Sequence, residues 1–222
     1  PGLDGGTGVK DDVRTTTLGE LVRETRGSIR TGPFGTTLRA SEYRASGVPV
    51  VSVGEVGYGA FRVHSETRRV GQDVLQRLPE YKLEVGDIVF GRKGSVDRSA
   101  TVRPAQSGWF LGSDGIRVRL GSGIDQLFVG YALQRLEARQ WLVVNSTGTT
   151  MATLNQLVLD GVPLVLPSLS EQHAVVNALD DISSLISLIE RLIAKKRDIK
   201  QGLMQELLTG RARLPGFTGE WR

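Results

Sequence analysis

The pattern of apolar and polar positions changes once along the chain, at Pro167. Before this point, apolar residues come in short runs bounded by glycine, proline or aspartate, which is typical of short strands joined by turns. The predicted strands are Val48–Val53, Asp87–Phe90, Ala100–Arg103, Gly115–Leu120 and Val162–Leu166. Helical spacing predicts helices over Leu18–Glu24 and Gln126–Val143. Because strands and helices do not alternate regularly, the pattern predicts an α+β fold.

After Pro167 the spacing predicts one long helix from near Leu169 to about Leu208, with Gly202 as a candidate weak point. Ser168 and Glu171 have the spacing of a capping box, which marks a helix start. Apolar residues then recur in steps of four and three, the pattern of a seam between two packed helices. The seam residues are Val175, Leu179, Ile182, Ile186, Ile189 and Ile193. About 40 residues would give a helix of roughly 60 Å, so we expect a partner helix beside it.

The chain of 222 residues has room for one ample domain, or for a medium domain with an extension. The expected division is a mobile tail over 1–12, a globular domain over 13–168, and the long helix with its tail over 169–222. The sequence contains no cysteine and two histidines, so we predict neither a metal site nor a cofactor. No segment approaches the roughly 20 apolar residues that span a bilayer, and we expect a cytoplasmic protein without a membrane segment.

The net charge of +4 is compatible with nucleic-acid binding but does not establish it. Two turns are the best candidates for recognition: the rigid turn Gly32-Pro33-Phe34-Gly35, flanked by Arg30 and Arg39, and the basic turn Gly91-Arg92-Lys93-Gly94-Ser95. Arginine can form two hydrogen bonds with guanine, whereas lysine suits phosphates. By residue type and loop placement, the expected DNA contacts are Arg30, Arg39, Arg44, Arg62, Arg68, Arg69, Arg92, Lys93 and Arg98. The basic cluster on the long helix, Lys195 to Lys200, is interpreted as a solvated face.

The sequence lacks a phosphate-binding loop of the G-x-x-x-x-G-K-[ST] type, a G-x-G-x-x-G fingerprint and a G-x-S-x-G nucleophile elbow. Asp73, Glu80 and Lys82 leave open a magnesium-dependent nuclease, in which carboxylates hold the metal and a lysine lies near the attacking water. Pro79 precedes the E-x-K triplet, however, and such triplets are common by chance. A second alternative is a protein-interaction adaptor that uses the long helix and does not bind DNA.

Several segments resemble the DNA-specificity subunits of type I restriction-modification enzymes. In that family, a proline-bounded strand passes into a long helix through an E-Q pair, here Glu171-Gln172. The resemblance is strongest in Asn155-Gln156, in 162–172, and in 200–210 with Arg213-Leu214-Pro215-Gly216-Phe217. Weaker landmarks occur in the family's order at 32–35, at 86–90 and at Gly148-Thr149-Thr150. The likeness therefore extends over nearly the whole chain.

The resemblance implies a non-catalytic protein that recognises one half of a bipartite sequence in double-stranded DNA. A methyltransferase (modification) subunit would supply methylation, and a restriction subunit would supply ATP-driven cleavage. Full-length members of the family contain two regions that look like recognition domains, each followed by a conserved helix. The two helices pack antiparallel. This chain has one of each and reaches Gly219-Glu220-Trp221-Arg222, so it resembles either a natural half-subunit or a truncation at the repeat boundary. A half-unit is expected to form a homodimer through its long helix.

Overall fold

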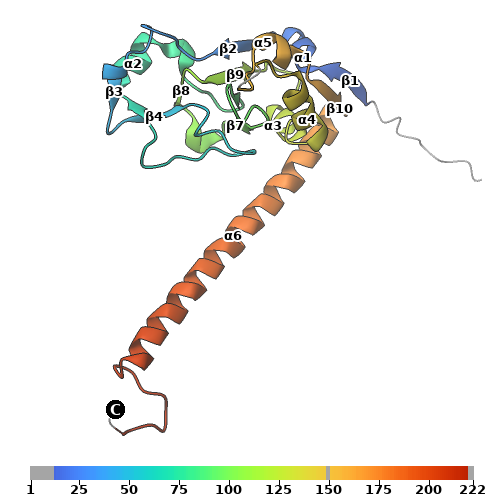
Figure 1. The fold of residues 1–222 in the computed structure, drawn as a ribbon. Helices are drawn as coiled ribbons and strands as arrows, with labels where there is room; N and C mark the ends of the chain where they lie inside the picture. The colour runs from blue at the N-terminus through green and yellow to red at the C-terminus, as the bar shows by residue number, and fades with distance from the viewer. Residues whose placement is uncertain (1–12, 149–150, 220–222) are drawn as a thin grey trace, which may run out of the picture. The chain divides into compact units, whose positions relative to one another are not determined.

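The structure, a computed structural model, describes residues 13–148 and 151–219. The predicted tail over 1–12, the landmark Thr149-Thr150 and the last residues Glu220-Trp221-Arg222 lie outside the described residues. The helices are α1 Leu18–Glu24, α2 Gln72–Arg77, α3 Gln126–Ala132, α4 Leu136–Asn145, α5 Gln156–Asp160 and α6 Leu169–Leu208 (Figure 1). The strands are β1 Arg14–Thr17, β2 Ser28–Thr31, β3 Tyr43–Arg44, β4 Val48–Val51, β5 Arg69–Val70, β6 Ile88–Gly91, β7 Ser99–Thr101, β8 Phe110–Leu111, β9 Gly115–Arg119 and β10 Pro163–Leu166. The α+β class and the long C-terminal helix are confirmed.

Two four-stranded sheets form the centre of the first part of the chain. The larger has the order β2-β9-β6-β7 and is antiparallel throughout. The smaller has the order β3-β5-β4-β8, in which β4 and β8 run parallel. In Figure 1 the smaller sheet and α2 lie on one side of the larger sheet, and α1, α3, α4 and α5 lie on the other.

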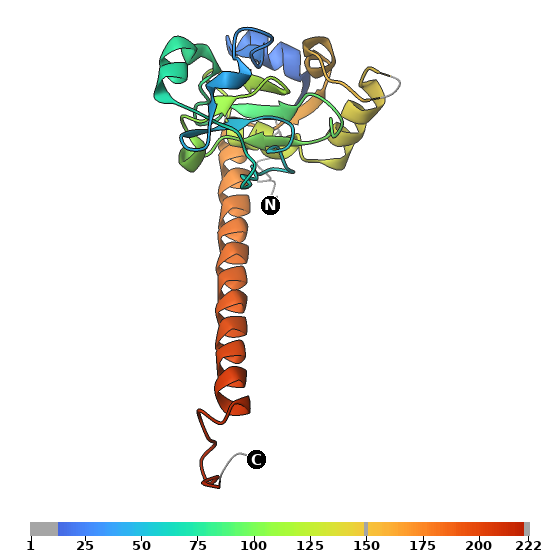
Figure 2. The same cartoon turned by 60° about the vertical axis from the view of Figure 1, so that its left-hand side comes forward.

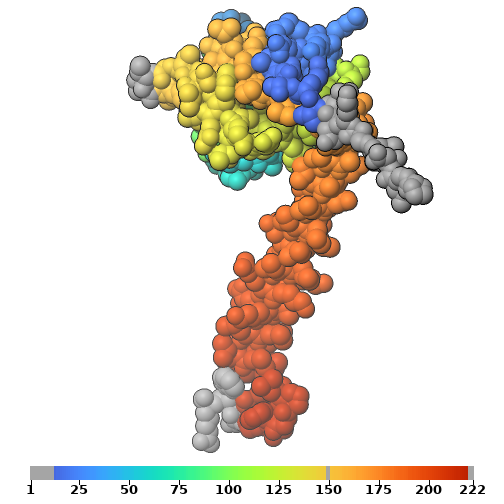
Figure 3. All heavy atoms as spheres, turned by 90° about the vertical axis from the view of Figure 1, so that its right-hand side faces the viewer, coloured from blue at the N-terminus to red at the C-terminus, as the bar shows by residue number. Residues whose placement is uncertain are grey.

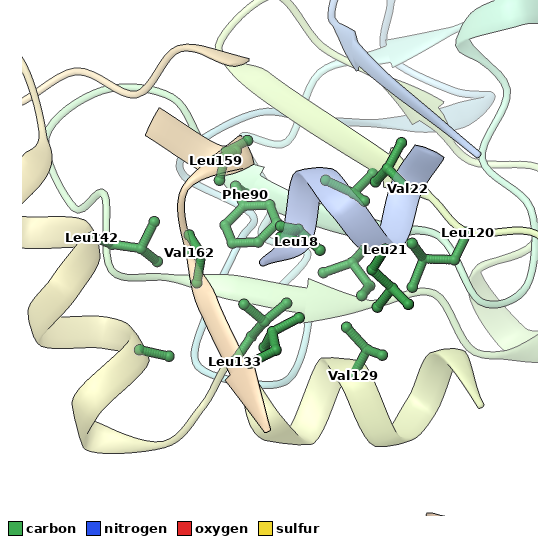
Figure 4. Close-up of a cluster of buried hydrophobic side chains, with 14 of the residues drawn as sticks. Leu18, Leu21, Val22, Phe90, Leu120, Val129, Leu133, Leu142, Leu159 and Val162 are labelled. Carbon is green, nitrogen blue, oxygen red and sulfur yellow. The ribbon is translucent and has the colours of Figure 1, made fainter. Parts of the chain in front are cut away.

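The main core lies between the larger sheet and these helices. α1 begins with a full capping box: the Glu20 N–H donates to Thr17 Oγ1, and the Thr17 N–H donates to Glu20 Oε2. This start directs Leu18 and Leu21 toward Phe90 of β6, and all three side chains are at most 1% exposed. Figure 4 shows them together with core side chains from α3, α4 and α5. On the opposite face of the sheet, Val89 packs in a second cluster with residues of β4 and β8.

A separate antiparallel pair brings together the two ends of this part of the chain. β1 pairs with β10, with Thr15 opposite Val165 and Thr16 opposite Leu164. In the space-filling view of Figure 3, the blue surface of β1 and α1 borders the orange surface of α5 and β10. The domain is thereby closed by its own first and last strands.

The prediction of one helix over Gln126–Val143 is wrong, because the chain turns between α3 and α4. Leu133 and Leu142 are both fully buried in the main core. At the turn, the Gln134 side-chain amide donates to the backbone oxygen and the hydroxyl of Ser99, at 3.0 and 2.7 Å. Arg135 is extended and precedes α4. The break lets both helices direct apolar side chains into the core, while Leu136, placed on the predicted apolar face, is 61% exposed.

The five predicted strands correspond to β4, β6, β7, β9 and β10, with ends that differ by one or two residues. Strands β1, β2, β3, β5 and β8 and the short helices α2 and α5 were not predicted. Three of these strands are only two residues long, so they carry no alternating pattern that a sequence could show. These short strands form because each pairs with a neighbouring strand in the sheet.

Helix α6 is one uninterrupted helix of 40 residues (Figure 2). It begins at Leu169, as predicted, and the Glu171 N–H donates to Ser168 Oγ at 3.4 Å, a long bond that supplies one half of the predicted capping box. Gly202 does not interrupt the helix, because the flanking turns continue the backbone hydrogen bonds. None of the described helices combines the length and the apolar character needed to cross a membrane.

The boundary between the two compact units of the chain falls within α6, between Val176 and Asn177. The first turns of α6 therefore belong to the first unit, where Gln172 and Val176 are buried. The Gln172 side chain accepts a hydrogen bond from the Asp125 N–H at 3.1 Å and donates to the Pro167 oxygen at 2.8 Å. The glutamine of the E-Q pair thus fixes the start of α6 to its domain.

Candidate nucleic-acid interface

Three connections meet at one end of the larger sheet, where β2 and β6 end and β7 and β9 begin. We call this edge the loop end. The Gly32 N–H donates to the Gly115 oxygen at 3.0 Å, and the Arg92 N–H donates to the Asp114 oxygen at 2.8 Å. A Cβ atom on Gly32 would lie 1.8 Å from the Gly112 oxygen, so a residue with a side chain could not approach this closely. The two turns predicted to serve recognition, 32–35 and 91–95, consequently lie next to each other.

One side of the loop end carries a cation placed over an aromatic ring. The Arg92 guanidinium carbon lies 4.5 Å from the ring centroid of Phe34, which is 50% exposed. Beside it, Lys93 Nζ forms an ion pair with Asp114 Oδ1 at 3.2 Å. A guanidinium stacked on an exposed ring is held in a defined plane while its edge stays accessible.

The other side of the β6–β7 connection has a more extensive cluster around Tyr58, which is 49% exposed. The guanidinium carbons of Arg98 and Arg139 lie 5.5 and 4.1 Å from the Tyr58 ring centroid. Asp97 Oδ2 accepts hydrogen bonds from the Tyr58 hydroxyl at 3.0 Å and from Arg139 Nη2 at 2.8 Å. Two cations and one carboxylate therefore surround a single ring.

The charge states of this cluster follow from its contacts. Burial acts to raise the pKa of Asp97, but the hydrogen bonds from Arg139 and Tyr58 outweigh it, so the pKa lies below its ordinary value. The hydrogen bond to Asp97 raises the pKa of Arg139. Asp97 is thus a stable carboxylate that neutralises Arg139. The positive charge of Arg98 has no carboxylate partner among the described residues.

The structure brings only some of the nine predicted contact residues together. Arg92, Lys93 and Arg98 lie at the loop end, in the connection between β6 and β7. Arg62 is exposed and follows a small hairpin, closed by a bridge between Val56 and Phe61, that carries Tyr58. Arg30 lies on β2 with its guanidinium carbon 5.6 Å from the Tyr81 ring centroid.

The remaining four lie near the smaller sheet, away from the loop end in the chain's topology. Arg44 forms an ion pair with Asp73 at 2.9 Å, and Arg69 donates to the Gly47 oxygen at 3.1 Å. The Arg68 guanidinium carbon lies 4.8 Å from the Tyr43 ring centroid. Arg39 precedes a short 3-10 helix over Ala40–Glu42 and is exposed. The nine residues therefore do not form one patch.

Sequence reasoning missed Tyr58, Asp97 and Arg139. A signal for Tyr58 was present, because an aromatic residue between Gly57 and Gly59 in a loop is well placed for exposure, and Gly59 has a positive φ of 75°. Its partners Asp97 and Arg139 are 39 and 81 residues farther along the chain. Only the fold brings them to the same ring.

Two further arginines are structural. Arg119 donates two hydrogen bonds of 2.7 Å to Asp87, which is 1% exposed, and these contacts raise the pKa of Arg119. Arg117 is 4% exposed and donates to the Glu80 oxygen at 3.0 Å. Arg117 is buried, and Arg119 is neutralised by Asp87 and Glu84, so neither offers a free positive charge to a polyanion.

The three residues of the nuclease alternative are not assembled on a sheet. Asp73 lies in the first turn of α2 and pairs with Arg44, and Glu80 lies in a 3-10 helix over Pro79–Tyr81, directly before Lys82. Among the described residues, no group of three histidine, aspartate or glutamate side chains is arranged to hold a metal ion.

Beyond Val176, α6 carries the predicted seam on its surface. Ile182, Ile186 and Ile189 are 54%, 52% and 47% exposed. A second set of apolar residues, Leu185, Leu188 and Leu192, is 56%, 57% and 53% exposed. Each of them precedes a seam position by one residue, and therefore lies about 100° around the helix from it. The helix thus presents two neighbouring apolar stripes.

Comparison with known proteins agrees with this geometry. The family model of the type I restriction modification DNA specificity domain matches residues 31–195. The chain is 25% identical over 220 residues to the type I restriction enzyme MjaVIII specificity subunit of Methanocaldococcus jannaschii. That alignment covers 93% of this chain and 48% of the relative, so the chain spans about half the length of the curated relative.

Solved structures show the same fold. The chain is similar to the S subunit of a type I restriction-modification system from M. genitalium, with a TM-score of 0.62, 17% identity, and coverage of 90% of this chain and 46% of that chain. It is also similar to the HsdS subunit from Thermoanaerobacter tengcongensis, with a TM-score of 0.55, 18% identity, and coverage of 93% and 46%.

Proposed function

Because this chain belongs to the type I restriction-modification DNA specificity family, we propose that it binds double-stranded DNA and recognises one half of a bipartite target sequence. Residues 13–168 would form the recognition domain, and residues 169–222 would form the spacer and assembly region. In this proposal the chain supplies recognition, and catalysis belongs to partner subunits. The observation that carries it is the meeting of two predicted turns at the loop end: the turn 32–35, which supplies Phe34, and the basic turn 91–95, which supplies Arg92 and Lys93.

The chemistry of the loop end suits a DNA duplex. Arginines over exposed aromatic rings present flat, charged edges, and backbone loops with glycine allow close approach of a phosphate backbone. The dispersed candidates Arg30, Arg39, Arg62, Arg68 and Arg69 form no ion pair with any described residue. They would extend the positive field along the backbone on either side of the recognised bases. Arg44 and Lys93 would have to exchange an acidic partner for a phosphate.

The exposed seam of α6 supports a homodimer. A stripe of isoleucines with step-four and step-three spacing is stable only when another apolar surface covers it. An antiparallel pairing of two copies would cover both seams with a two-fold axis between them. Two recognition domains would then be held at a fixed separation. Such a dimer favours a bipartite target whose two halves are inverted repeats.

The second stripe supports the attachment of further subunits. One partner helix covers one seam, so Leu185, Leu188 and Leu192 would stay partly exposed in a two-helix dimer. An apolar surface of this kind favours protein contact. We assign it to the methyltransferase subunit, with the restriction subunit joining the resulting complex. The basic residues Lys195, Lys196, Arg197 and Lys200 are exposed on the same helix and would stay solvated.

Sequencing of methylated sites tests the proposed function directly. The full chain is expressed with its modification subunit in cells lacking other methylation, and the methylated positions are mapped. We expect a bipartite motif with two-fold symmetry. An asymmetric motif would contradict the homodimer and would show that a different second half contributes. Absence of any methylated motif would contradict the assignment as a specificity subunit.

Binding experiments separate this proposal from its two alternatives. Salt-dependent binding to duplex DNA, with a preference that survives nonspecific competitor DNA, is expected for a specificity subunit and not for an adaptor. The nuclease alternative, through Asp73, Glu80 and Lys82, predicts that the chain alone cleaves DNA when magnesium is added. We expect intact DNA under those conditions, and cleavage that Glu80→Gln abolishes would overturn the proposal.

A further inference from the structure

The arginines of the described chain fall into two groups by what their guanidinium groups contact. Most arginines whose guanidinium group makes a contact donate a hydrogen bond to a protein oxygen, as Arg117, Arg119 and Arg139 do. Four arginines lie over an aromatic ring, yet their guanidinium groups form no hydrogen bond or ion pair with a described residue. These four are Arg30, Arg68, Arg92 and Arg98. A ring fixes the plane of such a group and leaves its donors available.

Two of the four, Arg92 and Arg98, begin and end the same connection at the loop end. The Gly91 N–H donates to the Arg98 oxygen at 3.3 Å, which closes the connection. It is anchored to the rest of the domain where the Leu154 N–H donates to the Arg92 oxygen at 2.8 Å and the Gly94 N–H donates to the Ala152 oxygen at 2.9 Å. The two guanidinium groups are therefore carried by one braced hairpin, and each rests on a ring from a different loop.

We propose that Arg92 and Arg98 are the specificity-determining residues of this chain and that each recognises a guanine in the major groove. The inference rests on the proposed DNA-binding function. The planar guanidinium edge matches the two acceptors of guanine, O6 and N7, which no other base presents together. Arg98 Nε is buried without a partner, so its available donors are the two terminal nitrogens, the ones that a bidentate contact uses.

Tyr58, Asp97 and Arg139 act as positioning residues for Arg98. Asp97 accepts from both Arg139 and the Tyr58 hydroxyl, so it fixes the ring and neutralises the cation that would otherwise repel Arg98. Asp97 makes these two contacts and none to Arg98, so the donors of the Arg98 guanidinium stay available for DNA. Phe34 positions Arg92 through its aromatic ring alone. The two sites thus differ in construction but present the same chemical group.

Selection from a library of duplex DNA with randomised sequence tests this inference. The wild-type chain is compared with Arg92→Ala and Arg98→Ala. We expect the wild-type chain to enrich a half-site with guanine at two positions, and each variant to lose the preference at one of them. Affinity for the selected site should fall roughly 5- to 150-fold per variant, as expected for one lost bidentate contact. Affinity for unrelated duplex DNA should change much less.

Lysine variants and a distant control keep the test interpretable. Arg92→Lys and Arg98→Lys retain the charge but lose the planar fork that rests on the ring, so the salt dependence of binding should persist while the guanine preference weakens. Arg14→Ala removes an exposed arginine that pairs with Glu24 on the other side of the domain and should leave the selected sequence unchanged. Tyr58→Leu should weaken the preference at the Arg98 position and leave the Arg92 position unaffected.

The possible failures are distinguishable. If the wild-type chain enriches no sequence, the proposed function itself is overturned, and this inference with it. If the wild-type chain enriches a sequence and the arginine variants enrich the same one at every position, the inference alone is overturned. A selected half-site without guanine would also overturn it, even if the variants bind less tightly.

Discussion

In the first compact unit most large apolar side chains form buried clusters, whereas in the second they lie on the surface of a helix. Leu18, Phe90 and Leu133 are fully buried, while Ile182 and Ile186 are more than half exposed. Burying one such side chain contributes about 1.5–3 kcal/mol relative to leaving it in water. The first unit therefore obtains its stability from its own core, whereas the apolar side chains of the second are not covered by any described residue.

The two units also differ in which kind of group is left without a partner. At the loop end of the first unit, the guanidinium groups of Arg92 and Arg98 lie on rings and have no acceptor among the described residues. On α6 the groups without cover are aliphatic. A polar surface with unused donors suits a polyanion, and an apolar stripe suits a protein. The difference supports two kinds of partner for one chain.

The largest expected effect comes from placing charges in the α6 seam. Ile186→Asp together with Ile189→Asp would remove four apolar side chains from a dimer, at a cost on the order of 6 kcal/mol. We expect monomers by light scattering and weaker binding to a bipartite site, with an unchanged melting transition of the first unit. Ser187→Asp, on the polar side of α6, is the matched control. A double variant that stays dimeric would contradict the seam assignment.

A smaller effect, confined to the first unit, is expected from Arg119→Ala. This change leaves the buried carboxylate of Asp87 without its partner and should lower the free energy of unfolding by about 3 kcal/mol. Denaturant unfolding followed by tryptophan fluorescence measures it, and the oligomeric state should not change. Arg14→Ala, which breaks an ion pair whose side chains are 53% and 47% exposed, should cost less than about 1 kcal/mol. Equal losses in both variants would argue against a structural role for Arg119.

Acid should weaken the cluster at the loop end. The pKa of Asp97 is lower in the folded chain than in the unfolded chain, so its stabilising contribution is complete above the ordinary aspartate pKa of about 3.9. It is lost as the pH falls below that value through the folded-state pKa. Unfolding midpoints measured against pH should fall less steeply in acid for Asp97→Asn than for the wild type, and parallel curves would contradict this.

The smallest effect is a gain in helix stability from Gly202→Ala. No atom lies within 4 Å of the position that a Cβ would take, so alanine fits without strain. Alanine favours a helix interior by about 1 kcal/mol over glycine. Hydrogen exchange of the α6 amides near residue 202 should slow, while exchange in the first unit should stay the same. Unchanged exchange around residue 202 would show that glycine does not limit this part of the helix.

Much of the fold could be predicted where the pattern is local. Helical spacing after Leu18, and the capping signal of Ser168 and Glu171 with the spacing after it, placed two helices correctly, because first-turn hydrogen bonds and one-sided burial depend on near neighbours. The break between α3 and α4 could not be predicted, since it depends on Ser99, which lies far from Gln134 in the sequence. Strands of two residues, such as β3 and β5, exist only because a neighbouring strand pairs with them.

The candidate site shows the same division between features that local sequence predicts and features that depend on long-range contacts. The sequence alone determined that a rigid turn flanked by arginines occurs at 32–35, that a basic turn occurs at 91–95 and that α6 carries an apolar stripe, because composition and periodicity are properties of short segments. The tertiary structure alone decided that Arg92 rests on Phe34, that Arg98 shares Tyr58 with Arg139, and that other arginines are neutralised. The physical reason is that the availability of a charged group depends on which acceptors and rings surround it, and residues distant in the chain supply these.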